Sequence, residues 1–234
     1  MKARFYMMLM LLMILSANGA FAQQEYHFDV NNDGEVNITD AILVVNYILG
    51  KTTEHGEDNA PCEPVDLGLP SGTKWASCNV GATKPEEYGG YYAYGEIEEK
   101  SKYDESTYEY FQNDSYVKIG DISGTQYDVA RLKWGGKWRM PTSTECEELI
   151  NNCDYKWTAI NRVYGMRLTS KINGNSIFFP ASNYWPYANG DQGLVRTGTE
   201  SGNAFCRVLS FSSRHVSVST GGKDHGIRVR PVTD

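Results

Sequence analysis

The residues best suited to chemistry lie in one short segment near the N-terminus, DVNNDGEVNITD, residues 29–40. Counting along this segment, positions one, three, five and twelve carry side-chain oxygens, and position seven offers its backbone carbonyl. In that order the five predicted ligands are Asp29, Asn31, Asp33, Asp40 and Glu35. Calcium takes about six to eight hard oxygen ligands, and this spacing is that of a twelve-residue EF-hand-type loop. We therefore predict Ca²⁺ as the cofactor.

Two further features separate this segment from an ordinary polar turn. Gly34 occupies the sixth position, where the calcium loop turns sharply, and Asn37 at the ninth can contribute through a water. An apolar segment, residues 41–49, follows directly and predicts a helix. A solvated Asx-turn would require neither the glycine nor the helix. Magnesium, which prefers a tighter octahedron, suits such a loop less well.

Elsewhere the sequence has no residues spaced for catalysis. The four histidines are scattered, and the serines at 210–213 lack the Gly-x-Ser-x-Gly pattern of a nucleophile elbow. The five cysteines contain no CxxC pair, their spacing does not decide a pairing, and their odd number leaves at least one thiol free. We therefore predict that the protein is not an enzyme.

Tyrosines are concentrated in one part of the chain, since eight of the sixteen fall between residues 88 and 116. Tyr91, Tyr92 and Tyr94 lie in a strand-like run and are expected to pack across a sheet. Tyr103, Tyr108 and Tyr110 lie in a polar stretch, where the same rings would suit a glycan or protein surface. The sequence leaves packing and ligand binding open for these three.

The N-terminal 22 residues have the pattern of a cleaved signal peptide. Lys2 and Arg4 precede an apolar run at 5–15, and Ala20 and Ala22 form a small-x-small cleavage site before Gln23. We therefore predict an exported protein, secreted or associated with the cell surface. The apolar run is too short for stable membrane insertion. The net charge of −7 argues against nucleic acid as a partner.

The segment FDVNNDGEVNITDAILVVNYILGK resembles one calcium-binding repeat of a type I dockerin. The resemblance implies calcium in the loop and contact with a cohesin on another protein through Ile38 and Thr39. Dockerins carry two such repeats, and this sequence has one. The helix at 41–49 is apolar on all sides except at Asn46, so it must be buried. Whether it packs against the rest of the chain or against another chain stays open.

The rest of the chain predicts an α+β domain with antiparallel strands and few helices, residues 65–234, after a polar linker at 51–64 and a dockerin-like unit at 23–50. Strands at 163–170 and 176–179 flank an Asn-Gly hairpin signal. Segments 204–211, 215–219 and 226–232 predict an antiparallel meander.

One helix stands out within this domain. Thr142 and Glu145 have the spacing of a capping box. Cys146, Leu149, Ile150 and Cys153 then form an apolar stripe at helical spacing, which predicts a core-facing helix.

Four motifs in this domain, at 65–82, 91–96, 135–150 and 226–232, together resemble the Fibrobacter succinogenes major paralogous domain of secreted bacterial proteins. The resemblance implies a C-type-lectin-like fold, distantly similar to formylglycine-generating enzymes. Those oxidases bind copper through cysteines near the C-terminal end, where this sequence has Cys206 alone. A lone cysteine in a strand is usually a core residue.

The leading hypothesis is therefore a secreted, non-catalytic, calcium-binding interaction protein whose partner is a protein or a glycan on the cell surface. One alternative is an accessory of polysaccharide degradation that a cohesin recruits. A second alternative is an oxidase of the formylglycine-generating type.

Overall fold

The structure is a computed structural model that describes residues 38, 41, 44–45, 60–187 and 190–234. The chain divides into two compact units, Met1–Glu57 and Asp58–Asp234. In the first unit the described residues are Ile38, Ala41, Val44 and Val45, all of them helical. The helices and strands below all belong to the second unit.

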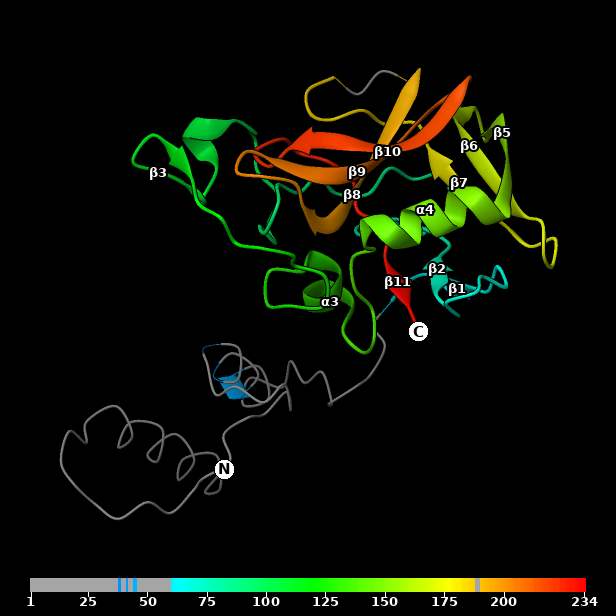
Figure 1. Ribbon diagram of the computed structural model, residues 1–234, viewed down its shortest axis with the longest axis horizontal. Coiled ribbons are helices and arrows are strands. Elements are labelled where there is room, and N and C mark those ends of the chain that lie inside the picture. The colour runs from blue at the N-terminus through cyan, green and yellow to red at the C-terminus, as the bar shows by residue number, and fades with distance from the viewer. Residues whose placement is uncertain (1–37, 39–40, 42–43, 46–59, 188–189) are drawn as a thin grey trace, which may run out of the picture. The chain divides into compact units, whose positions relative to one another are not determined.

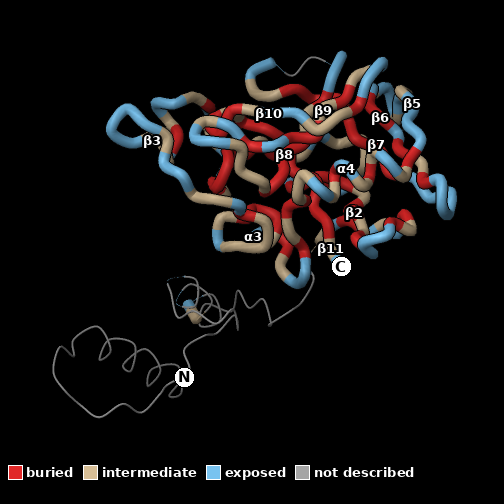
Figure 2. The backbone as a smooth tube through the Cα atoms, viewed as in Figure 1, coloured by how far each residue is buried: buried red, intermediate tan, exposed pale blue. Residues whose placement is uncertain are grey.

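The central sheet of the second unit is antiparallel, with strand order β10-β9-β8 (Figure 1). Its strands are β8 Gln192–Glu200, β9 Phe205–Ser212 and β10 His215–Gly222. The middle strand is buried on both faces, because Cys206 and Val208 pack into one apolar cluster while Leu209 and Phe211 pack into another. Figure 2 shows that buried residues are concentrated in this part of the unit.

A second antiparallel sheet has the order β5-β6-β7, with β5 Cys153–Ile160, β6 Val163–Ser170 and β7 Ser176–Pro180. A two-residue turn with positive φ at Asn161 and Arg162 joins β5 to β6, as tight hairpins require. The predicted hairpin of β6 and β7 is confirmed. Its loop is longer than two residues, since the Ser170 amide donates to the Asn175 carbonyl at 2.8 Å.

A third, small sheet joins the two ends of the unit. Its strands are β1 Pro64–Val65, β2 Lys74–Ala76 and β11 Val232–Thr233, in the order β1-β2-β11. The predicted meander is therefore wrong in its third strand. Residues 226–232 do not extend the β9–β10 hairpin; β8 pairs with β9 instead, and the C-terminal end pairs with β2.

The C-terminal segment 226–232 lies between two other parts of the unit. The Tyr92, Val80 and Ala76 amides donate to carbonyls along this segment, and the Arg196 amide donates to its Arg228 carbonyl at 2.8 Å from the other side. Backbone groups buried away from water must be paired, and this segment finds its partners on both sides. It therefore lies in the interior rather than at the edge of a meander.

Helix α4, Ser143–Asn152, packs against the β8–β10 sheet (Figure 1). The predicted capping box is confirmed: the Thr142 side chain accepts from the Glu145 amide, and the Glu145 carboxylate accepts from the Thr142 amide. The predicted apolar stripe is wrong at its last member, because Cys153 is the first residue of β5. Cys146 and Leu149 carry the buried face.

The remaining elements are short. Helix α3, Val129–Trp134, is capped by Asp128, whose carboxylate accepts from the Ala130 and Arg131 amides. The 3-10 turn η1 spans Glu105–Thr107, and β3 Phe111–Gln112 pairs with β4 Ser115–Tyr116. With antiparallel sheets and few helices, the described part of the chain confirms the predicted α+β class.

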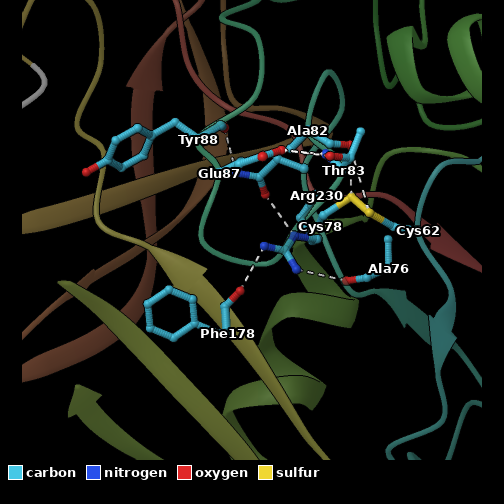
Figure 3. The surroundings of a disulfide bond; sticks show 10 residues. Cys62, Ala76, Cys78, Ala82, Thr83, Glu87, Tyr88, Phe178 and Arg230 are labelled. Atoms are coloured by element: carbon cyan, nitrogen blue, oxygen red, sulfur yellow. Dashed lines mark hydrogen bonds between the residues drawn. A yellow bond between two sulfur atoms is a disulfide. The ribbon is translucent and has the colours of Figure 1, made fainter. Parts of the chain in front are cut away.

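A disulfide bond joins Cys62, which precedes β1, to Cys78, which follows β2 (Figure 3). Close to it the buried guanidinium of Arg230 donates to the Ala76 and Phe178 carbonyls, each at 2.9 Å. Burial lowers the pKa of Arg230 to about 9. The interactions of this cation with carbonyls tie β2 and β7 to the C-terminal segment.

Candidate functional site

Most of the residues predicted to bind calcium or a partner lie outside the described residues. These are Asp29, Asn31, Asp33, Glu35, Asp40 and the contact residue Thr39. Ile38, the other predicted contact residue, is helical and 70% exposed. Such exposure leaves its side chain accessible, and its contact with a partner stays a prediction.

The three tyrosines considered for ligand binding form part of an aromatic cluster. Tyr103 and Tyr108 are buried, and their hydroxyls donate to the Tyr91 and Tyr94 carbonyls. The ring of Tyr110 packs edge-on against that of Tyr108, with 5.7 Å between their centroids. The structure thus shows these rings packed against their neighbours, with little of Tyr103 and Tyr108 left at the surface. Their role in ligand binding stays a prediction.

A groove of about 680 Å³ opens beside this cluster. One side comes from η1 and β4, and the other from the start of β9 and the turn after β10. The lining residues that carry charge or an aromatic ring are Lys102, Asp104, Glu105, Tyr116, Phe205, Asp224 and His225. We call this feature the η1–β10 groove. Its volume lies within the range of about 300–1,000 Å³ that is typical of small-ligand sites.

The η1 side of the groove is acidic. Asp104 pairs with Lys102 Nζ at 2.5 Å and accepts from the Ser106 hydroxyl at 2.6 Å. These two hydrogen bonds lower the pKa of Asp104 to about 2. The Tyr116 hydroxyl donates to Glu105 Oε1 at 2.9 Å. Burial, together with the carboxylates of Glu105 and Asp224, raises the pKa of Tyr116.

The other side of the groove carries Asp224 and His225, which follow β10 after Lys223. The His225 ring stacks on Tyr184, with 4.4 Å between centroids and 12° between planes. Burial lowers the pKa of His225, so the imidazole is neutral at pH 7. Phe205, at the start of β9, is 52% exposed.

The buried guanidinium of Arg196 binds backbone carbonyls of this turn. Arg196 donates to the Gly222 and His225 carbonyls at 3.2 and 2.5 Å, and its Nη1 lies 2.6 Å from Cys206 Sγ. Burial raises the pKa of the Cys206 thiol, although the cations Arg196 and Lys223 oppose that effect. A buried thiol with a raised pKa is a poor nucleophile. The Cys206 side chain packs in the apolar core and contacts Arg196.

Two further observations bear on this part of the chain. Within the described residues, no group of three or more His, Cys, Asp or Glu side chains is arranged to hold a metal ion. Among these same residues, no helix has both the length and the apolar character needed to cross a membrane.

Comparison with known proteins bears on the N-terminal segment. Residues 27–61 match the dockerin type I domain. No curated protein matches the chain, and no solved structure does. The dockerin match contains the whole predicted calcium loop and its helix, and it continues past Gly50 into the segment predicted as a linker. It supports calcium binding and a protein partner, since dockerin type I domains typically bind calcium and cohesins.

Sequence reasoning missed the η1–β10 groove. Residues 221–224 carry a turn signal, and the structure places the turn slightly later, because Gly221 and Gly222 are the last residues of β10. The only local signal was an Asp-His pair next to glycines, which is common in ordinary loops. The groove's other side comes from residues more than 100 positions away, which no local pattern identifies.

Proposed function

We propose that this chain is an exported, non-catalytic, calcium-dependent interaction protein. Its dockerin-type segment would bind Ca²⁺ through Asp29, Asn31, Asp33, Glu35 and Asp40 and would dock on a cohesin-type partner. The observation that carries the proposal is the dockerin type I match at 27–61, which coincides with the one-three-five-twelve oxygen spacing.

The second unit, in this proposal, is the binding module that the dockerin segment brings to an assembly. Its α+β architecture with antiparallel sheets is compatible with the C-type-lectin-like fold that the Fibrobacter major domain resemblance implies. The η1–β10 groove gives it a place for a ligand. The buried Cys206 supports a non-catalytic role, because an oxidase of the formylglycine-generating type would need a reactive cysteine there.

Export is part of the same proposal. The support is the basic, apolar and small-x-small order of the first 22 residues. Mass spectrometry of the protein from the extracellular fraction should find Gln23 as its first residue. Intact Met1 in that fraction would contradict a cleaved signal peptide.

Calcium titration and partner capture test the dockerin proposal. Calorimetry should show calcium binding to the full chain, with much smaller heats for Asp33→Ala and unchanged heats for the control Asp154→Ala, which removes an exposed carboxylate on β5. An immobilised cohesin should retain the wild-type chain with calcium and release it with a chelator. Equal heats for Asp33→Ala and wild type would remove the basis of the proposal.

The second candidate is a dockerin-type accessory of polysaccharide degradation, which the same family match favours. The two candidates differ in the ligand of the second unit. A glycan array should give binding to plant or microbial polysaccharides in the accessory case and no binding in the protein-partner case. Copper-dependent oxygen consumption by the purified chain would instead revive the oxidase alternative.

A further inference from the structure

The η1–β10 groove contains a carboxylate without a cation. Asp224 is 9% exposed and lines the groove. Within residues 60–187 and 190–234, the neighbouring ammonium groups are engaged by other carboxylates: Lys223 pairs with Glu200 and Lys102 pairs with Asp104, each at 2.5 Å. No ion pair to Asp224 forms among these residues. A carboxylate this buried is costly unless a cation or several donors satisfy it.

The nearest donor, the Tyr116 hydroxyl, satisfies this carboxylate only in part. Tyr116 lies close enough to Glu105 and Asp224 for both carboxylates to raise the pKa of its hydroxyl, after the larger effect of burial. The hydroxyl hydrogen-bonds to Glu105 Oε1 at 2.9 Å and also reaches the Asp224 carboxylate, but a phenol has one proton to share between them. Two carboxylates therefore flank one donor, and the groove keeps an excess of negative charge at its Asp224 end.

The same groove also carries an exposed apolar ring. Phe205 is 52% exposed although it opens a strand whose other apolar residues are buried, and it lines the same groove. An aromatic ring next to a carboxylate suits a side chain with an apolar stem and a cationic head, because the stem packs on the ring while the head meets the carboxylate. Arginine and lysine have this form.

A metal ion fits the groove less well than an organic cation. Calcium would need about six to eight oxygens, yet the described residues offer no cluster of three acidic or histidine ligands here. The volume of about 680 Å³ also has room for several residues of a peptide rather than for a single ion.

We propose that the η1–β10 groove binds a basic segment of a partner protein, with an arginine or lysine side chain seated between Asp224 and Phe205. This proposal specifies the partner chemistry for the second unit and so rests on the binding role proposed for that unit. It does not involve the predicted calcium loop, so the calcium titration above is independent of it.

The test uses the full chain and two capped tripeptides, Gly-Arg-Gly and its neutral control Gly-Gln-Gly. NMR titration should show binding of the arginine peptide and none of the glutamine peptide. Asp224→Asn should weaken binding of the arginine peptide by about tenfold or more, as loss of a buried charge partner does. Phe205→Ser should weaken it less. The matched control Asp154→Asn, an exposed acid on β5, should bind like the wild type.

Three outcomes would overturn the proposal. In the first, Asp224→Asn binds the arginine peptide like the wild type, or both peptides bind equally. In the second, Ca²⁺ alone shifts the groove resonances in wild type and in Asp33→Ala but not in Asp224→Asn, which would make the groove a metal site. In the third, a neutral N-acetylglucosamine trimer binds more tightly than the arginine peptide, which would make it a glycan site.

Folding of the variants is checked by near-UV circular dichroism. If Asp224→Asn fails to fold, Glu105→Gln provides the second variant, because Glu105 is exposed and lies across Tyr116 from Asp224. This variant should weaken binding of the arginine peptide by about threefold, which is the effect expected from removing a partly solvated charge. Unchanged affinity in Glu105→Gln would then count against the proposal.

Discussion

Lys223 Nζ lies 2.5 Å from Glu200 Oε1, and the two side chains are 0% and 6% exposed. The strand pairing explains why they meet: Glu200 at the end of β8 and Gly221 near the end of β10 both pair with Cys206 of β9. Lys223 also lies over the Tyr94 ring, 5.7 Å from its centroid. This ion pair fixes the turn that carries Asp224 and His225.

Replacing Glu200 with alanine should therefore destabilise the second unit strongly. The change leaves the Lys223 ammonium buried without its partner, which typically costs about 3–5 kcal/mol. Urea denaturation should show that loss in the free energy of unfolding. As a control, Asp154→Ala removes an exposed ion pair in which Asp154 Oδ1 lies 3.9 Å from Lys171 Nζ. This change should alter stability by less than about 1 kcal/mol. Equal stability of the two variants would show that the pair contributes nothing net.

The start of α4 should make stability depend on pH. Burial alone would raise the pKa of Glu145, but hydrogen bonds from Arg139 and Thr142 outweigh it and leave the pKa lowered. A carboxylate whose pKa is lowered on folding adds stability above its unfolded value of about 4.3 and loses it as the pH falls through the folded value. Glu145→Gln should flatten the fall in stability below about pH 4.3, measured by thermal melts across that range. A parallel fall in both proteins would contradict this role.

The cap itself can be separated from the charge. Thr142→Ala removes the hydroxyl that accepts from the Glu145 amide while Arg139 can still pair with Glu145 at 2.6 Å. We expect a loss of about 1 kcal/mol at pH 7, the usual cost of an N-cap. The pH profile of this variant should be slightly flatter than that of the wild type, because the Thr142 hydroxyl also donates to Glu145, but steeper than that of Glu145→Gln, because the Arg139–Glu145 pair remains.

The disulfide should contribute measurably to the second unit. Cys62 and Cys78 are 16 residues apart, and closing a loop of about 15 residues stabilises by about 3 kcal/mol in the chain-entropy account. Reduction with a mild thiol should lower the melting temperature accordingly.

The three free cysteines, Cys146, Cys153 and Cys206, are buried. They should react with a thiol reagent only after unfolding, and rapid labelling of the native protein would contradict their burial.

Removal of calcium should affect the two units differently. In the predicted loop Asp29, Asp33 and Asp40 would repel one another without the ion, so a chelator should open the loop and loosen the segment that follows it. The second unit has its own core, formed by clusters between Cys62 and Val232, and should stay folded. Limited proteolysis with and without a chelator checks this through cleavage near Lys51. A single cooperative unfolding of the whole chain on chelation would contradict it.

Part of this protein is determined by short stretches of sequence. The capping box of α4 links residues three positions apart, and the β6–β7 hairpin is signalled by Asn173 and Gly174 in its own loop. The predicted calcium ligands likewise lie within one twelve-residue loop, which the dockerin type I match contains. Such features are readable because the interactions that stabilise them join near neighbours in the chain.

Other features were decided only by tertiary structure. The alternation at 226–232 predicted a strand, but period-two patterning does not say which strand is its partner. The segment pairs with β2 because both of its faces are buried, with Ile227 and Val229 in the apolar core and Arg228 and Arg230 bonded to carbonyls. The pairing of Cys62 with Cys78 depended on the pairing of β1 with β2, which brings the residues that flank these strands together.

The tyrosines and the groove show this limit most clearly. Tyr103 and Tyr108 lie in a polar stretch, yet the chain folds back so that their hydroxyls reach the carbonyls of residues 91 and 94. Asp224 and Phe205 face η1 only because β9 and β10 end beside it. A sequence pattern records which residues are near along the chain. Burial of distant apolar surface decides which residues meet in space, so the groove exists only in the folded protein.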